Sequence, residues 1–468
     1  MIRKHLVRIG TTYHVGRRRM THTVAGTATD TAETSVSPAI NLPPGPRASK
    51  LTAGVLFILS RRTALKRLAR KYGAAISVDV PMFGPTVLIT DPELARQVLL
   101  TSPDDLGNVQ PNLSRILGAG SVFALDGAAH RRRRNLLSPP FHGKRVRAYE
   151  QIIVEETLRE IATWPIGKPF ETLRPMNRIT INVILRAIFG AEGAELDKLR
   201  IGLPKWVTLG SKLAALPIPI RPYGRLTPWG RLAAWRAEYE IVLDKLIEDV
   251  RADPDFESRT DVLTLLLSST YEDGTVMTRE EIGDELLTLL AAGHETTAST
   301  MAWVFERLSR FPELLDELTA EADTDGATLR RATIREVQRV RTVIDFSGRH
   351  VYAPSIQVGE WVIPRGHSVI VAINQVHQNP AAFNDPDEFD PKRYLDGSPS
   401  AFEWMPYGGG TRRCPGSTFA NLEMDVVLRT VLRNLTIEPT TAPGEKFHSR
   451  GIAFTPKKGG QITVRPRG

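Results

Sequence analysis

The chain has 468 residues, of which 41% are hydrophobic and 24% are charged, so it can bury a large core and is not a disordered polymer. Its longest uncharged apolar run, residues 51–60, is far shorter than the ~20 residues that a bilayer-spanning helix needs, which excludes a transmembrane protein. The net charge of +9 lies mainly in the first 20 residues, which contain no acid, so nucleic-acid binding is not expected.

Residues 1–40 show no lasting hydrophobic period, and we predict that they form a disordered basic tail. The stretch has no acid before Asp30, as a mitochondrial transit peptide would, and the alternative is that translation begins at Met20. We favour the second explanation. Residues 41–468 contain no repeat and no low-complexity linker, so we expect a single domain there.

The domain begins with short elements. Prolines make residues 42–47 stiff, and residues 76–80 and 86–90 alternate like the two strands of a hairpin. Asp91 followed by Pro92 predicts the start of a short helix, because Asp is a favoured N-cap and Pro a favoured first helical residue.

The rest of the domain favours helices. Apolar spacing predicts mostly helix from residue 127 to 345, with a proline-rich break at 216–230. Short strands are expected at 349–373, followed by an irregular stretch rich in Asn, Asp and Pro at 378–400. The predicted fold class is therefore mainly α with a small β component, in a single large helix-rich domain.

Cys414 is the only cysteine, which excludes an intrachain disulfide and a cysteine-based zinc cluster and fits a reducing compartment. Three glycines precede it, and Pro415 is expected to open an amphipathic helix with Cys414 at its N-terminus. The helix dipole, Arg412 and Arg413 should favour the thiolate over the thiol. The glycines should let the backbone lie flat against a large planar group, and a thiolate in such a loop suits porphyrin iron.

Two alternatives for Cys414 stay open at this point, a buried packing residue and a catalytic nucleophile. Neither His nor Asn lies near Cys414 in the sequence to support a nucleophile, although a partner could come from a distant segment.

The segment around Cys414 resembles the haem-binding loop of the cytochrome P450 family, whose pattern is Phe-x-x-Gly-x-Arg-x-Cys-x-Gly. The chain matches it at Gly410, Arg412, Cys414 and Gly416, and it has Tyr407 where the family usually has Phe. The resemblance extends from about Leu42 to the C-terminus, and it implies haem b as cofactor with the Cys414 thiolate as axial ligand to the iron.

A long helix is predicted before residue 311, because Thr278 and Glu281 form a capping box and Phe311-Pro312 ends the pattern about thirty residues later. Its middle, residues 292–297, is similar to the family's oxygen-activation motif.

The resemblance assigns roles to the residues of this motif. Gly293 would leave room for dioxygen, and Thr296 would bond back to the carbonyl of Ala292 and orient water. Glu295 would supply a carboxylate for proton delivery. We assign no metal-binding role to His294, which is expected at the helix surface or in packing.

Glu336 and Arg339 lie three residues apart on one helix face and are similar to the family's Glu-x-x-Arg pair, which Arg393 would complete as a buried structural triad. The family commonly has Pro three residues after the helix arginine, and here Thr342 stands there, which puts the following turn in doubt.

The two haem propionates need cationic partners. His130 and Arg134 share a face of the helix predicted from Asp126-Gly127 and are similar to the family's propionate-binding pair, with Arg134 turned inward and Arg132 or Arg133 turned outward. By resemblance the remaining propionate contacts are Arg349, His377 and Arg412.

The resemblance, which is to the bacterial soluble type, implies a haem-thiolate monooxygenase that uses O2. Electrons would come from an acidic ferredoxin or flavodoxin with its NAD(P)H reductase, because no such domain is expected in the chain. The protein would be cytoplasmic, with peripheral membrane contact left open, or in the mitochondrial matrix if residues 1–40 are a transit peptide. The arginines expected on the docking surface are Arg132, Arg133, Arg330, Arg331, Arg335 and Arg413.

The expected substrate is an apolar small molecule or a lipid-like compound. The loops at about 103–123 and 205–230 would line its pocket, and the proline-rich part would be a stiff loop or a lid that touches membrane. Two alternatives stay open: a peroxygenase or isomerase, which often lacks the Glu295-Thr296 pair, and a haem-binding sensor without turnover. The predicted lining residues are Leu113, Ile116, Leu117, Val122, Phe123, Trp206, Leu213 and Trp229.

Overall fold

Helices predominate in the part of the chain that the computed structural model describes, which is residues 39–46, 50–80, 83–109, 111–141, 143–190, 193–214, 224 and 226–468. The predicted tail at 1–40 lies outside these residues apart from Ala39 and Ile40. The helices are α1 (Lys50–Tyr72), α2 (Pro92–Leu100), α3 (Pro111–Leu117), α4 (Gly127–Leu137), α5 (Lys144–Ala148), α6 (Glu150–Ile161), α7 (Leu173–Phe189), α8 (Ala194–Ala214), α9 (Pro228–Ala252), α10 (Val262–Ser268), α11 (Arg279–Leu308), α12 (Pro312–Ala322), α13 (Thr328–Val340), α14 (Ile373–Val376) and α15 (Ser417–Asn434).

The strands in the described part of the chain are short and contribute few residues, so the expected fold class, mainly α with a small β component, is confirmed. They are β1 (Ala75–Val80), β2 (Gly84–Ile89), β3 (Leu106–Asn108), β4 (Phe170–Glu171), β5 (Phe346–Val351), β6 (Ser355–Val358), β7 (Trp361–Pro364), β8 (Ser368–Ala372), β9 (Leu435–Ile437), β10 (Phe447–Ser449), β11 (Phe454–Pro456), β12 (Gln461–Ile462) and β13 (Val464–Pro466).

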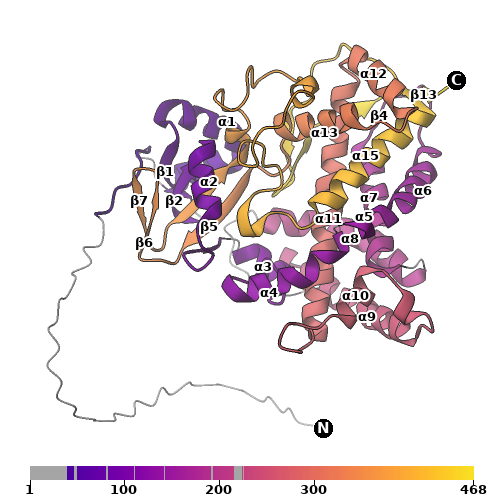
Figure 1. Cartoon of the computed structure of the whole chain (residues 1–468), viewed down its shortest axis with the longest axis horizontal. Helices are drawn as coiled ribbons and strands as arrows, with labels where there is room; N and C mark the ends of the chain where they lie inside the picture. The colour runs from indigo at the N-terminus through magenta and orange to yellow at the C-terminus, as the bar shows by residue number, and fades with distance from the viewer. Residues whose placement is uncertain are drawn as a thin grey trace, which may run out of the picture. The chain divides into compact units, whose positions relative to one another are not determined.

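The main sheet has five strands in the order β1-β2-β8-β5-β3 and packs against α1 and α2 (Figure 1). The predicted hairpin pairs Ala75 with Ile89 through Val80 with Gly84. The short predicted helix is α2, whose first N–H groups bond to the carboxylate of Asp91, as the sequence indicated.

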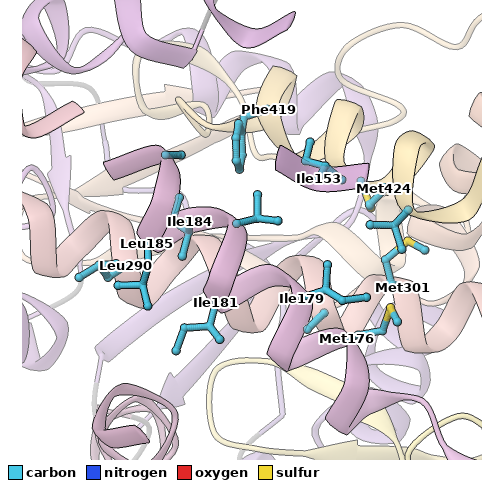
Figure 2. Close-up of a cluster of buried hydrophobic side chains, with 14 of the residues drawn as sticks. Ile153, Met176, Ile179, Ile181, Ile184, Leu185, Leu290, Met301, Phe419 and Met424 are labelled. Carbon is cyan, nitrogen blue, oxygen red and sulfur yellow. The ribbon is translucent and has the colours of Figure 1, made fainter. Parts of the chain in front are cut away.

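The helical core forms where α6, α7, α11 and α15 meet. Figure 2 shows Ile184 and Leu185 of α7 beside Leu290 of α11, with Phe419 of α15 close by. These side chains are almost fully buried, and each contributes about 1.5–3 kcal/mol of transfer free energy. The core therefore fixes α11 between helices that are distant in the sequence.

The long predicted helix is α11. The hydroxyl of Thr278 accepts from the N–H of Glu281, and the carboxylate of Glu281 accepts from the N–H of Thr278, so the capping box is confirmed. The helix ends at Leu308, and α12 begins at Pro312, as expected. Among the described helices, none combines the length and hydropathy needed to cross a membrane.

The proline-rich break is shorter than predicted at its C-terminal end. The prediction placed residues 216–230 outside helices, but α9 begins at Pro228, because Thr227 is an N-cap whose hydroxyl accepts from the N–H of Gly230. Residues 215–223 and 225 lie outside the described part of the chain.

Candidate functional site

The loop before α15 holds Cys414 in a turn of backbone. The N–H of Cys414 donates to the carbonyl of Tyr407 at 2.9 Å, and α15 begins only at Ser417, with Gly416 as its N-cap. The prediction that Pro415 opens the helix is therefore wrong by two residues, because Pro415 and Gly416 form a turn.

Cys414 has solvent-exposed surface, yet the protein atoms packed around its thiol keep much of the surrounding water away, which raises the pKa of the thiol. A backbone hydrogen bond with Gly416 and the positive charges of Arg134 and Arg413 act in the opposite direction but do not overcome it. The backbone and Arg413 thus favour the thiolate, as expected, but the loss of water around the sulfur outweighs them. A bound metal cation would add the charge that deprotonates the sulfur.

The glycines of the loop serve packing against α2. Gly408 and Gly410 have φ values of 67° and 64°, a region that favours glycine. A Cβ on Gly410 would lie 1.8 Å from the carbonyl oxygen of Leu99. Neighbouring α2 therefore requires glycine at this position, independently of any planar group.

Tyr407 has a structural use for the hydroxyl that the usual Phe lacks. Its oxygen accepts from the side-chain amide of Gln338 on α13 at 2.8 Å and donates to Asn421 on α15. The departure from the family pattern thus joins the two helices that flank the Cys414 loop.

Three arginines and one histidine converge close to this loop. The pKa of His130 falls to about 4, first because it is buried and then because Arg412, Arg134 and Arg349 lie nearby. The pKa of Arg349 falls to about 10 for the same reasons, burial first and then Arg412. Arg134 lies close enough to Cys414 for the two to interact electrostatically. The sequence prediction placed these four residues at the propionates, and the structure brings them together.

Among the described residues, the carboxylate of Asp126 faces this cluster. Arg412 donates to Asp126, which also accepts from the N–H of Asn108 at 2.8 Å and from the hydroxyl of Tyr352 at 3.0 Å. Arg349 bonds only to neutral oxygens among its recorded contacts, and one of them is the carbonyl of Gly409 at 3.4 Å. The positive surplus fits the two carboxylates of a porphyrin.

Asp126 was missed as a site residue. The sequence identified it only as the start of α4, and its side chain makes no capping bond there. Its partners Asn108 and Tyr352 come from β3 and from the residue after β5, so no local pattern could have revealed the contact.

His377 is not available to a propionate. It is fully buried, its Nδ1 lies 3.0 Å from the hydroxyl of Thr342, and its Nε2 accepts from the N–H of Met405 at 2.9 Å. Burial lowers the pKa of His377 to about 3, so the ring is neutral and both of its nitrogens are already used in these contacts. The expected propionate contact is contradicted, because the sequence could not show that packing uses both nitrogens.

The predicted triad residues are in contact. Arg339 donates to both oxygens of Glu336 at 2.8 and 2.7 Å, and Arg393 donates to Glu336 at 3.3 Å. Arg339 also donates to the carbonyls of His377, Pro386 and Glu388. The triad thus fastens the irregular segment after α14 to α13.

Thr342 supplies an ordered turn where the family commonly has Pro. Its hydroxyl lies 3.1 and 2.8 Å from the carbonyls of Gln338 and Arg339, at the end of α13. The turn is therefore ordered without the usual Pro, because the Thr342 hydroxyl binds the last carbonyls of α13.

One face of α11 remains open. Leu289, Ala292, Gly293 and Thr296 recur at helical spacing, and Ala292 is exposed in the middle of an otherwise buried helix. The hydroxyl of Thr296 bonds to the carbonyl of Ala292 at 2.8 Å, as predicted. At Gly293 a Cβ would lie 3.3 Å from Ile184, so this glycine also permits close packing of α7.

The acid and the histidine of the α11 motif point into the protein. Glu295 is buried and forms an ion pair with Arg450 at 2.7 Å. His294 is buried, and its Nδ1 lies 3.0 Å from the carbonyl of Leu290, so it is a packing residue.

Two of the arginines expected on the docking surface are buried. Arg133 bonds to Glu285 at 2.9 Å, and Arg330 bonds to Asp425 at 2.9 Å, so both predictions of exposure are wrong. Arg132 is exposed, which agrees with the prediction that either Arg132 or Arg133 turns outward. The other exposed arginines of the predicted set are Arg331, Arg335 and Arg413.

The predicted pocket residues divide into two groups. Four are buried in the main core, namely Leu117, Trp206, Leu213 and Trp229. Four are partly buried against the same core, namely Leu113, Ile116, Val122 and Phe123. The second group, from the segment between β3 and α4, has side-chain surface left for a ligand.

The comparisons with known proteins agree with this arrangement. The sequence matches the family described as Cytochrome P450 over residues 43–464. A Mycobacterium tuberculosis protein named cytochrome P450 138 is 62% identical over 430 residues, which are 92% of this chain and 98% of that protein. Another protein of the same species, named cytochrome P450 135B1, is 37% identical over 91% of this chain and 92% of its own length.

Solved structures with the same fold include the retinoic acid-bound cyanobacterial CYP120A1, with a TM-score of 0.81 and 22% identity over 92% of this chain and 100% of that one. The cytochrome P450DA heme domain has a TM-score of 0.78 and 21% identity over 92% and 98% of the two chains. The two relatives named above are mycobacterial, so they give the mitochondrial explanation of residues 1–40 no support.

Proposed function

The chain belongs to the cytochrome P450 family, and we propose that it is a monooxygenase that inserts one oxygen atom of O2 into an apolar small molecule or lipid-like substrate. Haem b is the proposed cofactor. The observation that carries the proposal is the gathering of His130, Arg134, Arg349 and Arg412 beside the only cysteine. The cysteine would bind the haem iron as a thiolate, and the other four side chains would hold the two anionic propionates.

Cys414 is the proposed iron ligand, and these four side chains are the proposed propionate partners, with Asp126 orienting Arg412. When bound, the haem iron supplies the oxygen activation, and electron donation from a thiolate favours cleavage of the O–O bond. Gly410 lets the chain turn before Cys414, because its φ of 64° lies in the region that favours glycine, and the hydroxyl of Tyr407 fixes the loop to α13 and α15.

Thr296 is the proposed residue that orients water. Its hydroxyl proton is used in the bond to the carbonyl of Ala292, so its oxygen lone pairs are left to accept a hydrogen bond from a water molecule. Glu295, the preceding residue, is the proposed source of protons, because a carboxylate is the titratable group of this motif.

The proposed electron donor is an acidic ferredoxin or flavodoxin with its NAD(P)H reductase. Exposed guanidinium groups at Arg132, Arg331, Arg335 and Arg413 support this proposal, since they would attract an acidic surface. The partly buried residues Leu113, Ile116, Val122 and Phe123 support an apolar substrate.

The absorption spectrum of the reduced protein under carbon monoxide tests the proposal, because it reports whether a thiolate holds the iron. The wild type should show the band typical of a thiolate ligand, and Cys414→Ser should lose it together with oxidation of any substrate. Thr418→Ala, at an exposed position on α15, is the matched control and should leave the spectrum unchanged. An unaltered spectrum and oxidation rate in Cys414→Ser would refute the proposed function.

A further inference from the structure

The turn of the β10–β11 hairpin packs against α8. The N–H of Arg450 donates to the carbonyl of Ala453 at 2.9 Å and closes the turn. Gly451 has a φ of 111°, and a Cβ there would lie 2.3 Å from the carbonyl oxygen of Ser211. The N–H of Ile452 donates to the hydroxyl of Ser211 at 3.0 Å. The position of this turn is therefore set by α8.

The same hairpin is fastened to α11 at a second point. The indole N–H of Trp303 donates to the carbonyl of Phe454 at 3.2 Å, and the N–H of Phe454 donates to the carbonyl of Val343 at 2.9 Å. The hairpin thus bridges α8, α11 and the segment after α13, and its turn lies where these elements meet.

One guanidinium at this turn contacts both helices. Nε of Arg450 donates to Glu295 at 2.7 Å, and Nη2 donates to the hydroxyl of Thr208 on α8 at 2.7 Å. The Glu295 side chain is only 7% exposed and that of Arg450 is 27% exposed, so the ion pair is largely screened from water. An ion pair in such surroundings is much stronger than one on the surface.

The titratable groups that interact with Glu295 in the described part of the chain are His294 and Arg450. His294, on the same helix, is buried and its pKa is lowered, first by burial, with Glu295 and Arg450 acting in opposite directions. His294 is therefore neutral, and Arg450 is the cation recorded against Glu295 among the described residues. Glu295 precedes Thr296, and successive side chains on a helix point about 100° apart. In this contact the carboxylate is directed to the hairpin.

We propose that Arg450 is the positioning residue for Glu295, and that Thr208 fixes Arg450 so that the position of α8 controls the carboxylate. With α8 against the hairpin, the ion pair keeps the Glu295 carboxylate directed to Arg450. A displacement of α8 that breaks the contact between Thr208 and Arg450 loosens this hold and lets the carboxylate take up and deliver protons near Thr296. The inference rests on the proposed function, since it assigns a control to the proton source of that reaction.

The first test measures the protonation of Glu295 directly in the haem-loaded protein. Infrared spectra of glutamate-labelled protein are recorded across a pH series, and the spectrum of Glu295→Gln is subtracted to isolate this carboxyl group. In Arg450→Gln the titration midpoint should rise by about one pH unit or more, because a buried carboxylate loses its cation. Arg450→Lys keeps a positive charge and should restore most of the wild-type midpoint.

The second test uses turnover with a surrogate ferredoxin and reductase. Arg450→Gln should shift the pH profile of product formed per NAD(P)H consumed and change the solvent isotope effect on it. Thr208→Val, which removes only the contact to α8, should shift both in the same direction by less. The matched control is Arg465→Gln, which breaks an exposed ion pair with Glu438 and should change neither.

The outcomes separate the two proposals. A wild type without the thiolate band under carbon monoxide refutes the proposed function. A normal band, with the Glu295 midpoint and the pH profile unchanged in Arg450→Gln, refutes the role of Arg450 alone. A lower melting temperature as the sole effect also refutes it, because that is what a purely structural residue would give. If Arg450→Gln does not fold, Arg450→Lys and Thr208→Val still decide the question by the same two readouts.

Discussion

His377 is a residue whose chemistry depends on its burial. Its pKa is about 3 in the folded protein against an ordinary value of 6.5, because the ring is buried and lies close to Arg339. Between these pH values the unfolded chain binds a proton that the folded protein does not bind. The free energy of unfolding should therefore fall as the pH drops below 6.5, by up to about 1.4 kcal/mol per pH unit from this residue.

Urea unfolding at a series of pH values between about 4 and 7 checks this prediction. His377→Gln cannot take up the proton, so its stability should fall less steeply toward acid than that of the wild type. His448→Gln, at an exposed position, should follow the wild type. Parallel curves for the wild type and His377→Gln would contradict the prediction.

Arg349 is a buried member of the cluster whose hydrogen bonds go to neutral oxygens, while the charge of Asp126 acts on it without a hydrogen bond. Its charge is therefore available to a propionate. Arg349→Met should weaken haem affinity by about 10- to 100-fold, since a hydrogen bond to a charged group is worth about 1.5–3 kcal/mol. The rate of haem transfer to an acceptor protein measures this loss.

The control for Arg349 is Arg331→Met, because Arg331 is 69% exposed and does not belong to the cluster. Haem should leave this variant at the wild-type rate. Equal rates in the two variants would show that Arg349 is not a propionate partner.

At the scale of elements, the triad joins α13 to the segment after α14. Glu336 is fully buried and accepts from Arg339, from Arg393 and from the N–H of Asp390 at 3.0 Å. Glu336→Gln should destabilise the protein by about 3–5 kcal/mol, because Arg339 would be left as an unpaired buried charge.

Chemical unfolding of Glu336→Gln measures this cost. The matched control is Glu317→Gln, which breaks the exposed ion pair with Lys392 and should cost less than about 1 kcal/mol. Similar losses in the two variants would contradict a structural triad.

At the scale of the whole molecule, the exposed arginines should steer an acidic electron donor. The rate of reduction by a ferredoxin should therefore fall as salt is raised, because the Debye length shrinks to about 8 Å at physiological ionic strength. Stopped-flow reduction at several salt concentrations checks this.

The residues to vary in this experiment are Arg331, Arg335 and Arg413, which are exposed. Arg330 is the buried arginine with which these exposed ones are compared. It pairs with Asp425 and cannot contact a partner protein directly. A reduction rate that is independent of salt would exclude this docking surface.

The sequence determined what depends on residues close together along the chain. The capping box at Thr278, the N-cap at Asp91 and the back-bond of Thr296 each involve residues two to four positions apart, so the pattern alone predicted them. The loop around Cys414 was found in the same way, because its motif is continuous.

Only the tertiary structure decided which face of an element each side chain serves. Arg133 turned inward, His377 used both nitrogens in packing, and Asp126 joined three segments that no local pattern connects. Arg450 reaches Glu295 across 155 positions of sequence. Such contacts depend on how distant helices and strands pack together, because burial and partner distance are set by that packing and not by neighbours along the chain.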